Sequence, residues 1–551
     1  MKIIPKSVLL IIAMHCAGSA LAQSAASHRA MPMPPMPMPP ASNSAPIFST
    51  DTTGLPAVLP TSEVILKDGD NFTLDASPAK QNVAGQWIRR LAYNGSVPGP
   101  IFRVKQGSSV HLTLKNDTEI ETTLHSHGLR LDSHFDGVPG VGQKPIAPGE
   151  SFTYDLTFPD AGIYWYHPHI REDYTQNAGL YGIFLVEPSD ATTYNVVHKE
   201  VPLVLNDILI DMKQPFQKNV VTHTLMGRFG NVDLVNGMVL PTFNITVGEV
   251  IRFFVLNSSN ARSYAFSIPG SQLKVVGGDN GLTEKEEWAT KVILGPGERA
   301  IVEVSFAKAG AFSIVNAKPT NPTKLAKIVV SAGQVAALPI PFKILRQSTV
   351  ATAEIAKVRR LFQKPVDKKL TLTLAMDMAG DSMGGMDMGN GSMDGMDMSG
   401  GSMGGMDMGS MNPAPSNNPG IEWEDDMGAM NSASTNKSVT WKMVDDSTAK
   451  ENTDIQWSFK KGDYIKIRFF NDPKSMHPMQ HPIHFHGQRF VVSSMDGKTP
   501  ENLGWKDTVL IPSGSTYEII LEASNPGSWM SHCHISEHLE ANMMLNFNVT
   551  E

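Results

Sequence analysis

Short runs of alternating apolar and polar residues recur along most of the chain. Examples are VHLTL at 110–114, FTYDL at 152–156 and IVEV at 301–304, each preceded by a turn that contains Gly. Side chains of a strand alternate between the two faces of a sheet, so a period of two predicts half-buried β-strands. Many short strands separated by turns predict an all-β protein made of sandwiches or barrels.

Two sequence elements each occur three times, and they predict the number of domains. The first element reads KQGSSVHLTLKND at 105–117 and returns at 247–259 and 460–472. The second element contains two glycines 13 residues apart and occupies 148–169, 296–317 and 513–534. This repetition predicts three copies of one β-sandwich, over residues 46–195, 196–340 and 341–551.

Three segments do not follow the alternating pattern. Residues 1–22 carry Lys2 and Lys6, a short apolar run and Ala20-Leu21-Ala22, which is typical of a cleaved secretory signal. A membrane anchor is the alternative, but spanning a bilayer takes roughly 18–20 apolar residues, more than this run offers. Residues 23–45 are rich in Pro and Met and are expected to form a disordered arm.

The third segment is an insertion in the last domain, over residues 376–430. Twelve methionines lie between 376 and 411, in near-decamer repeats such as SMGGMDM, with Gly, Ser and Asp between them. This composition cannot bury a core, so we expect a mobile insertion. A linker whose composition has drifted is the alternative interpretation.

Composition and charge limit the classes of function. The chain has 551 residues, 41% of them apolar, and a net charge of −8, which becomes −10 when Lys2 and Lys6 leave with the signal. This acidic balance argues against nucleic acid as a partner. Of the two cysteines, Cys16 lies in the signal, so the mature chain keeps only Cys533 and has no disulfide framework.

Ten of the 17 histidines fall into four clusters in the first and third domains. The clusters are His125-Ser-His127-Gly, His167-Pro-His169, His481-Pro-Ile-His484-Phe-His486-Gly and His532-Cys533-His534-Ile-Ser-Glu-His538. On a strand, residues i and i+2 point to the same face, so each His-x-His pair presents two imidazoles together. Imidazole suits copper, zinc, iron and nickel.

The cluster around Cys533 distinguishes between these metals. His532 and His534 would face one side of a strand while Cys533 faces the other, together with His481 and His538. Met543 lies ten residues further along the chain. Two His, one Cys and a weak axial Met form the blue-copper electron-transfer set, and the other eight histidines can converge on a cluster of metal ions. A structural zinc site needs four ligands and leaves the other histidines without a role.

These motifs, HxHG, HxH, HPxHxHG and HCHxxxH with Met, resemble those of the three-domain multicopper oxidases, which include laccases and bacterial cuprous oxidases. The resemblance implies three cupredoxin-like Greek-key β-sandwich domains and four copper ions. It places type 1 copper on His481, Cys533, His538 and Met543, and type 2 copper on His125 and His484. It places one type 3 copper on His127, His167 and His534, and the other on His169, His486 and His532.

The resemblance also implies the reaction. Four one-electron oxidations at type 1 copper would be coupled to reduction of O₂ to two waters at the trinuclear cluster. Asp136 matches the acidic residue of the family beside that cluster and is expected to help supply protons; a turn cap before Gly137 is the alternative role. Bacterial members often have Glu directly after the last type 1 histidine, whereas this chain has Leu539 there and Glu540 next.

Three reductants stay open: Cu(I), phenols or other aromatic compounds, and Fe(II) or Mn(II). Thioether sulfur is soft and selects Cu(I), and the Met-rich insertion resembles that of bacterial copper-efflux oxidases. In those enzymes a substrate copper site occupies positions that match Met376, Asp381, His477 and Met479 here, with His477 in place of an acidic residue. We therefore expect a cuprous oxidase with a role in copper resistance.

Two other classes of protein share some of these features. A periplasmic copper-buffering protein would also carry Met-rich repeats, but the complete set of ligands favours an enzyme. A two-domain nitrite reductase lacks the third domain and the four His-x-His pairs. We expect a monomer with no transmembrane anchor, exported to the bacterial periplasm.

Overall fold

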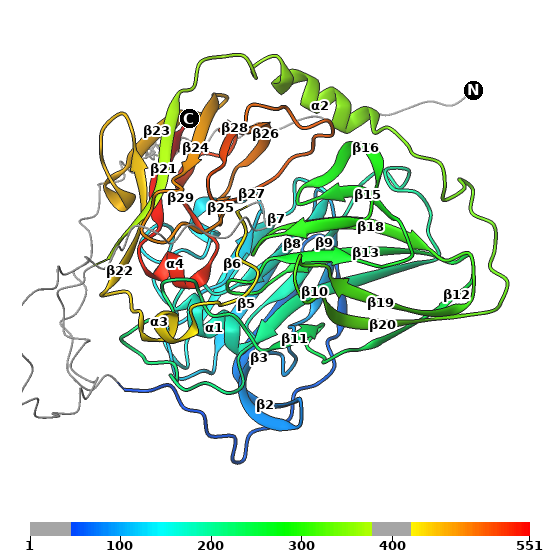
Figure 1. Ribbon diagram of the computed structural model, residues 1–551, viewed down its shortest axis with the longest axis horizontal. Helices are drawn as coiled ribbons and strands as arrows, with labels where there is room; N and C mark the ends of the chain where they lie inside the picture. Colours follow the sequence, from blue (N-terminus) through cyan, green and yellow to red (C-terminus); the bar gives the residue numbers. More distant parts are fainter. Residues whose placement is uncertain (1–45, 377–419) are drawn as a thin grey trace, which may run out of the picture. The chain divides into compact units, whose positions relative to one another are not determined.

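The computed structural model describes residues 46–376 and 420–551. The predicted signal (1–22), the predicted arm (23–45) and residues 377–419 of the predicted insertion lie outside the described residues. The described strands form six sheets, two for each copy of the repeat (Figure 1). The predicted all-β fold is confirmed.

Domain 1 contains the strands between residues 63 and 187. One of its sheets has the order β1 (Glu63–Leu66), β4 (Ile101–Lys105), β9 (Gly182–Glu187), β8 (Gly162–His167), β6 (His125–His127). The other has the order β3 (Gln86–Tyr93), β2 (Asn71–Val83), β5 (Ser109–Asn116), β7 (Ser151–Thr157). Strands β6 and β8, which carry candidate ligands, therefore lie side by side at one edge of the first sheet.

Domain 2 contains the strands between residues 199 and 331. One sheet has the order β11 (Val232–Val235), β10 (Lys199–Ile208), β13 (Val250–Asn257), β18 (Arg299–Ser305), β15 (Leu273–Gly278), β16 (Gly281–Ala289). The other has the order β12 (Thr242–Thr246), β20 (Thr323–Ser331), β19 (Gly310–Asn316), β14 (Tyr264–Ser267), β17 (Lys291–Leu294). None of the predicted copper ligands lies on these strands.

Domain 3 contains the described strands between residues 368 and 550. One sheet has the order β22 (Val439–Asp445), β21 (Lys368–Met376), β24 (Tyr464–Asn471), β28 (Thr516–Glu522), β26 (Arg489–Met495). The other has the order β23 (Gln456–Lys460), β30 (Met544–Thr550), β29 (Gly527–Cys533), β25 (His481–Phe485), β27 (Thr508–Ile511). Each pair of sheets falls within one of the ranges 46–195, 196–340 and 341–551, and we propose these ranges as the three domains.

The two repeated sequence elements occupy equivalent strands in the three domains. The first element forms β5, β13 and β24, and the second begins with β7, β18 and β28. In each domain these two strands pair antiparallel. The second element then continues into β8, β19 and β29 of the other sheet, so one element bridges both layers of each sandwich.

In residues 46–376 and 420–551, four short α-helices connect the strands: α1 (Glu172–Ala178), α2 (Thr349–Arg359), α3 (Gly428–Ala433) and α4 (Ser536–Glu540). Ser348 caps the start of helix α2, since its hydroxyl accepts a hydrogen bond from the Ala351 amide. The helix buries Ile355 and Val358 against Trp505. Within the described residues, no helix has the length and apolar character needed to cross a membrane.

The apolar core of domain 3 includes residues from outside its own strands. Leu225, Met226 and Phe229, from the segment that precedes β11, are buried in the same cluster as Trp441 and Cys533. The Trp441 indole donates a hydrogen bond to the Thr224 carbonyl. A segment of domain 2 therefore completes the core that surrounds the only cysteine of the described residues.

Both ends of the predicted insertion belong to the folded part of the chain. Met376 is the last residue of β21 and packs against the core of domain 3. Ile421 and Trp423 are buried in a cluster with Ala265 and Leu510. Residues 420–430 therefore pack against domains 2 and 3.

Candidate metal centres

Four strands bring the eight clustered histidines between domains 1 and 3. In domain 1, β6 pairs antiparallel with β8, and His125 lies opposite His167. In domain 3, β25 pairs with β29, and His484 lies opposite His532. Within β6 the alternation of side chains turns His125 and His127 to the same side, as the sequence predicts. His169, His486 and His534 lie just beyond the ends of β8, β25 and β29, and their rings also reach the cluster.

The eight imidazoles lie close together. Three groups have their ligand atoms within 4.8 Å of one another: His125, His484 and His486; His125, His127 and His167; His169, His486 and His532. His534 has its ring centroid 4.9 Å from that of His127 and 5.3 Å from that of His167. The structure thus brings together every histidine of the predicted trinuclear set.

Some of the ring nitrogens lie within hydrogen-bonding distance of a protein oxygen, and others have no partner in the part of the chain that the structure describes. The Nδ1 atoms of His125, His167, His484 and His532 are 2.8–2.9 Å from backbone carbonyl oxygens, to which they can donate. Buried ring nitrogens without a partner among the described residues are Nε2 of His125, His167, His169 and His484, Nδ1 of His127, and both nitrogens of His534. Unpartnered buried nitrogens are costly, and a shared metal cluster is the group that they fit.

The burial of the rings also favours their metal-binding form. Burial, reinforced by the neighbouring imidazoles, lowers the pKa of His127, His167, His169, His484, His486 and His534 well below its ordinary value. Burial lowers the pKa of His532 to about 4. These imidazoles are therefore neutral at neutral pH, and neutral imidazole is the form that binds a metal.

A second, smaller centre lies on the other side of β29. The Cys533 sulfur is 3.6 Å from His481 Nδ1 and 3.7 Å from His538 Nδ1. All three side chains are completely buried, and the Trp441 ring stacks on His538 with centroids 4.1 Å apart. Met543 is also buried, and its carbonyl accepts a hydrogen bond from the Cys533 amide.

The chemistry of this small centre also fits a bound cation. Burial raises the pKa of the Cys533 thiol, so the sulfur stays protonated unless a positive charge replaces the proton. Burial lowers the pKa of His481 to about 3. A buried thiol between two neutral imidazoles fits a thiolate-binding metal ion.

Asp136 touches two of the clustered histidines. Its Oδ2 is 2.8 Å from His486 Nδ1, its Oδ1 is 3.3 Å from His125 Nδ1, and it is completely buried. Asp136 therefore lies beside the cluster, where its match to the acidic residue of the family predicts it. Its backbone carbonyl is also 2.8 Å from His125 Nδ1, so Asp136 orients that ring as well.

Two buried carboxylates beside the histidines, Asp507 and Glu172, were not predicted from the sequence. Asp507 Oδ1 is 3.0 Å from His127 Nε2, and Glu172 Oε1 is 3.3 Å from His169 Nδ1. Only the chain's folding brings Asp507 to His127, which is 380 residues away in sequence. Glu172 could have been noticed, since it stands three residues after His169 at the start of α1.

The residue after His538, Leu539, lies in an apolar environment. Leu539 is buried with Val138 and Met530. Glu540 instead accepts a hydrogen bond from the Glu172 amide, at 3.1 Å. Burial and the charge of Asp173 raise the pKa of Glu540 to about 7.

The residues predicted for substrate copper are only partly described. Met479 is completely buried in the core of domain 3, and Met376 packs against the same core. His477 has a buried Nε2 without a partner among the described residues, and its charge would act on His481 and His538. Asp381 lies outside the described residues, but Asp425 is near enough to His477 to act on it electrostatically.

Comparison with known families decides the identity of this fold. Three models described as multicopper oxidase match residues 77–191, 185–336 and 425–551. The chain belongs to the multicopper oxidase family. It is therefore an oxidoreductase whose cofactor is copper, and the resemblance inferred from its histidine motifs is confirmed.

Relatives of this multicopper oxidase share its length as well as its fold. It is 26% identical over 495 residues to the multicopper oxidase mco of Staphylococcus aureus, covering 87% of this chain and 89% of that protein. It is 24% identical to a copper resistance protein A homolog of Pseudomonas syringae, covering 88% and 93%. A solved structure of a Campylobacter jejuni multicopper oxidase, described as a metallo-oxidase, matches over 92% of this chain and 99% of its own, with TM-score 0.63 and 24% identity.

Proposed function

We propose that this multicopper oxidase transfers electrons one at a time from a small reductant, with Cu(I) favoured, to O₂, which is reduced to water. The observation that carries the proposal is the position of Cys533. Its sulfur faces His481 and His538, while the next residues on either side, His532 and His534, belong to the group of eight histidines. Two metal centres are thereby connected through a few covalent bonds.

The proposed ligand sets follow the family motifs. Type 1 copper takes His481, Cys533, His538 and Met543, and type 2 copper takes His125 and His484. The type 3 pair takes His127, His167 and His534 on one ion and His169, His486 and His532 on the other. When bound, these four coppers supply the one-electron acceptance and the four-electron reduction of O₂ that define the family.

The residues of this chain hold the ligands and handle protons. Asp136 anchors His486 and His125 and is the carboxylate proposed to deliver protons. The backbone from His532 to His534 keeps the two centres at a constant separation. The burial of both centres excludes water and side reactions.

The proposal of Cu(I) as reductant rests on soft ligands near the small centre. Met479 lies in the core that holds Cys533, and Met376 packs against that core. His477 is close enough to His481 to act on it electrostatically. The methionines of 383–411 and Asp381 precede α3 in sequence. Thioether sulfur prefers Cu(I) to Fe(II) or Mn(II). Residues 1–22 support export, and we propose that the enzyme acts as a monomer in the periplasm in copper resistance.

One experiment tests this proposal directly. Oxygen uptake is measured on one copper-saturated sample with Cu(I), Fe(II), Mn(II) or a phenol as the reductant. We expect the highest kcat/KM with Cu(I). A higher value for the phenol would replace the cuprous function with a laccase function, and no uptake with any reductant would indicate a copper-buffering protein.

Deleting residues 382–411 is expected to lower Cu(I) turnover and raise phenol turnover. If the methionines contribute about 1.4 kcal/mol to the binding of Cu(I), their loss lowers kcat/KM for Cu(I) about tenfold. As a matched control, replacing the methionines of 382–411 with glutamine keeps the length of the segment. This control should lower Cu(I) turnover without raising phenol turnover. Unchanged Cu(I) turnover in both variants would refute the role of the methionines.

Asp136→Asn is expected to lower kcat by about 10²-fold or more, the range found when a group that transfers protons is lost. The amide keeps the size of the side chain but cannot carry a proton to the cluster. Copper content and visible spectrum should stay close to those of the wild type. A loss of turnover fully explained by lost copper would instead make Asp136 a purely structural anchor.

A further inference from the structure

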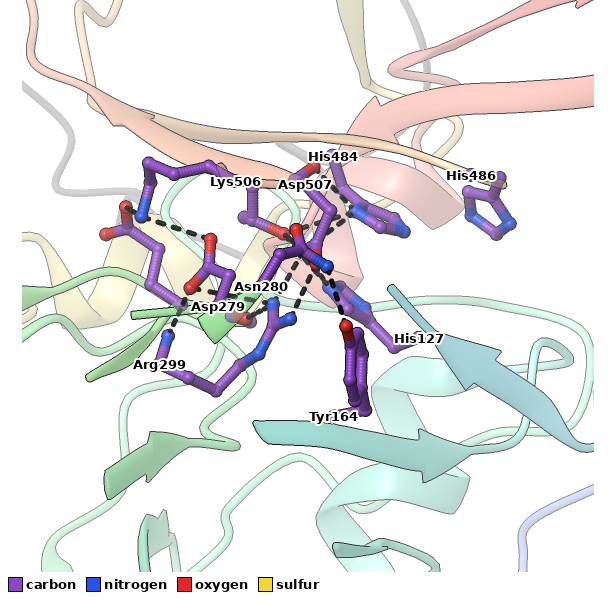
Figure 2. A network of polar contacts seen from close by, with 12 residues as sticks. His127, Tyr164, Asp279, Asn280, Arg299, His484, His486, Lys506 and Asp507 are labelled. Carbon is purple, nitrogen blue, oxygen red and sulfur yellow. Dashed lines mark hydrogen bonds and ion pairs between the residues drawn. The ribbon is translucent and has the colours of Figure 1, made fainter. Parts of the chain in front are cut away.

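Domain 2 supplies a buried arginine at the point where all three domains meet. Arg299, the first residue of β18, donates from Nη1 to Asp507 Oδ1 and from Nη2 to Asp507 Oδ2, at 2.6 Å each. Its Nε donates to the Ile163 carbonyl of domain 1, at 2.8 Å. Both side chains of the Arg299–Asp507 pair are completely buried, and Figure 2 shows the pair inside a wider network with Asp279 and Lys506.

Asp507 in turn contacts two of the clustered histidines. Its Oδ1 is 3.0 Å from His127 Nε2, and its backbone carbonyl oxygen is 2.9 Å from His484 Nδ1 (Figure 2). Thr508 also reaches both rings, since its Oγ1 lies 2.9 Å from His127 Nε2 and 3.1 Å from His484 Nδ1, and it donates to Asp507 Oδ1. A single residue thus fixes one ring through its side chain and another through its backbone.

These contacts select the tautomer of each ring. A carboxylate and a carbonyl only accept hydrogen bonds, so the proton of His127 resides on Nε2 and that of His484 on Nδ1. The free nitrogens are then His127 Nδ1 and His484 Nε2, and both are buried without a partner among the described residues. His127 therefore has Nδ1 available to a metal, whereas His125, His167 and His484 have Nε2 available.

Asp507 is also close enough to His127 and His484 to be a metal ligand itself. The geometry argues against that role, since each of its carboxylate oxygens already accepts a short hydrogen bond from the guanidinium. A planar, permanently charged fork matches a carboxylate in a way that the point charge of lysine cannot. Arg299 therefore keeps Asp507 as a hydrogen-bond acceptor for imidazole.

Two glycines show how closely this pair approaches the cluster. A Cβ on Gly128, directly after His127, would lie 2.4 Å from Asp507 Oδ2 and 2.9 Å from Arg299 Nη2. A Cβ on Gly297 would lie 2.9 Å from a carbon of the His534 ring. Both glycines have positive φ. The missing side chain of Gly128 leaves space for the Arg299–Asp507 pair beside His127, and that of Gly297 lets the segment before Arg299 approach the His534 ring.

We infer that Arg299 is a positioning residue for the trinuclear site, acting through Asp507 on His127 and His484, although its domain carries none of the proposed ligands. This inference rests on the proposed function only for the identity of the metal. The orientation of the rings is a property of the metal-free chain as well. The partners that orient a metal-binding histidine typically change metal affinity or activity by about 10- to 100-fold when they are removed.

The test compares two arginine-to-lysine variants in the same domain. Arg252 is an equally buried arginine, paired with Glu303 at 2.6 Å across β13 and β18, and touches none of the histidines of the cluster. We expect Arg299→Lys to weaken copper binding at the trinuclear site by about 10- to 100-fold and to change its type 2 electron paramagnetic resonance spectrum. The visible absorption of the Cys533 centre should persist. Arg252→Lys should leave both spectra as in the wild type.

A second measurement does not depend on copper or on the survival of a variant. In the metal-free wild-type chain, ¹⁵N chemical shifts of the histidine rings, with His127 assigned through a His127→Gln variant, should show the Nε2–H tautomer for His127. Thr508→Val, which keeps all charges, should weaken that preference. An Nδ1–H tautomer in the wild type, or identical trinuclear spectra in Arg299→Lys and Arg252→Lys, would overturn the inference. Absence of any trinuclear signal in copper-loaded wild type would instead refute the proposed function.

Discussion

Replacing Cys533 by serine is expected to abolish both the intense visible absorption of the copper-loaded enzyme and its oxidase turnover. The colour of a His₂Cys copper site comes from its thiolate, and a hydroxyl group cannot replace the soft, anionic sulfur. Serine is almost the same size, so the completely buried position should stay well packed. Visible spectra, copper per chain and oxygen uptake measure the result, and we expect one copper fewer per chain.

Met543→Leu provides the matched control for that experiment. Met543 is as deeply buried as Cys533 and belongs to the same apolar core, so the two variants disturb comparable positions. A weak axial ligand adjusts the reduction potential but does not create the colour, so this variant should stay blue. A Cys533→Ser variant as blue and as active as the wild type would disprove the assignment of the electron-accepting site.

Mild acid is expected to destabilise the metal-free protein. Histidines with a lowered pKa bind protons more readily when the chain is unfolded, and His481 (pKa about 3) and His532 (pKa about 4) are two of them. Between about pH 6.5 and 4.5 the unfolded chain therefore takes up protons at these positions, so the free energy of unfolding falls as the pH falls.

Buried carboxyl groups with a raised pKa have the opposite effect on the free energy of unfolding, so the net pH dependence is the difference between the two contributions. Burial raises the pKa of Glu537 and Glu540 to about 7, and such groups favour the folded state as the pH falls. In the described part of the chain, eleven histidines have a lowered pKa. Seven carboxyl groups have a raised pKa. The histidines outnumber them, so we expect a net loss of at least about 1.4 kcal/mol per pH unit.

Urea denaturation of metal-free protein from pH 7 to 4.5 measures this slope, and copper should flatten it while the metal stays bound. His223→Asn is the matched control. His223 is buried with a pKa of about 3, is not a proposed ligand, and has a positive φ that asparagine tolerates. This variant should reduce the slope by about 1.4 kcal/mol per pH unit with or without copper. Stability that is constant or rises toward pH 4.5 would contradict the prediction.

Local spacing was enough to predict the fold class and the convergence of the histidines. The alternation of side chains on a strand places His532 and His534 on one side of β29 and Cys533 on the other, and the structure has this arrangement. The threefold repeat likewise corresponds to equivalent pairs of strands. Such features depend on residues that are close in sequence or on a pattern that recurs, and both can be read directly from the sequence.

Contacts between distant segments could not be predicted in this way. Arg299 and Asp507 are 208 residues apart, and Trp441 and Thr224 are 217 apart. The two residues of each pair lie in different domains, so no fixed spacing in the sequence connects them. Only the packing of the three domains brings them together, and that packing cannot be predicted from local sequence patterns.

The segment of domain 2 inside the core of domain 3 restricts how a reductant can approach. Swinging the two domains apart would pull Leu225, Met226 and Phe229 out of an apolar environment and would break the bond from Trp441 to Thr224. Exposing three such side chains costs several kcal/mol, at roughly 1.5–3 kcal/mol each. Hinged opening is therefore unfavourable, and on the proposed ligand assignment the reductant would deliver its electrons at the closed surface nearest the buried His481 and His538.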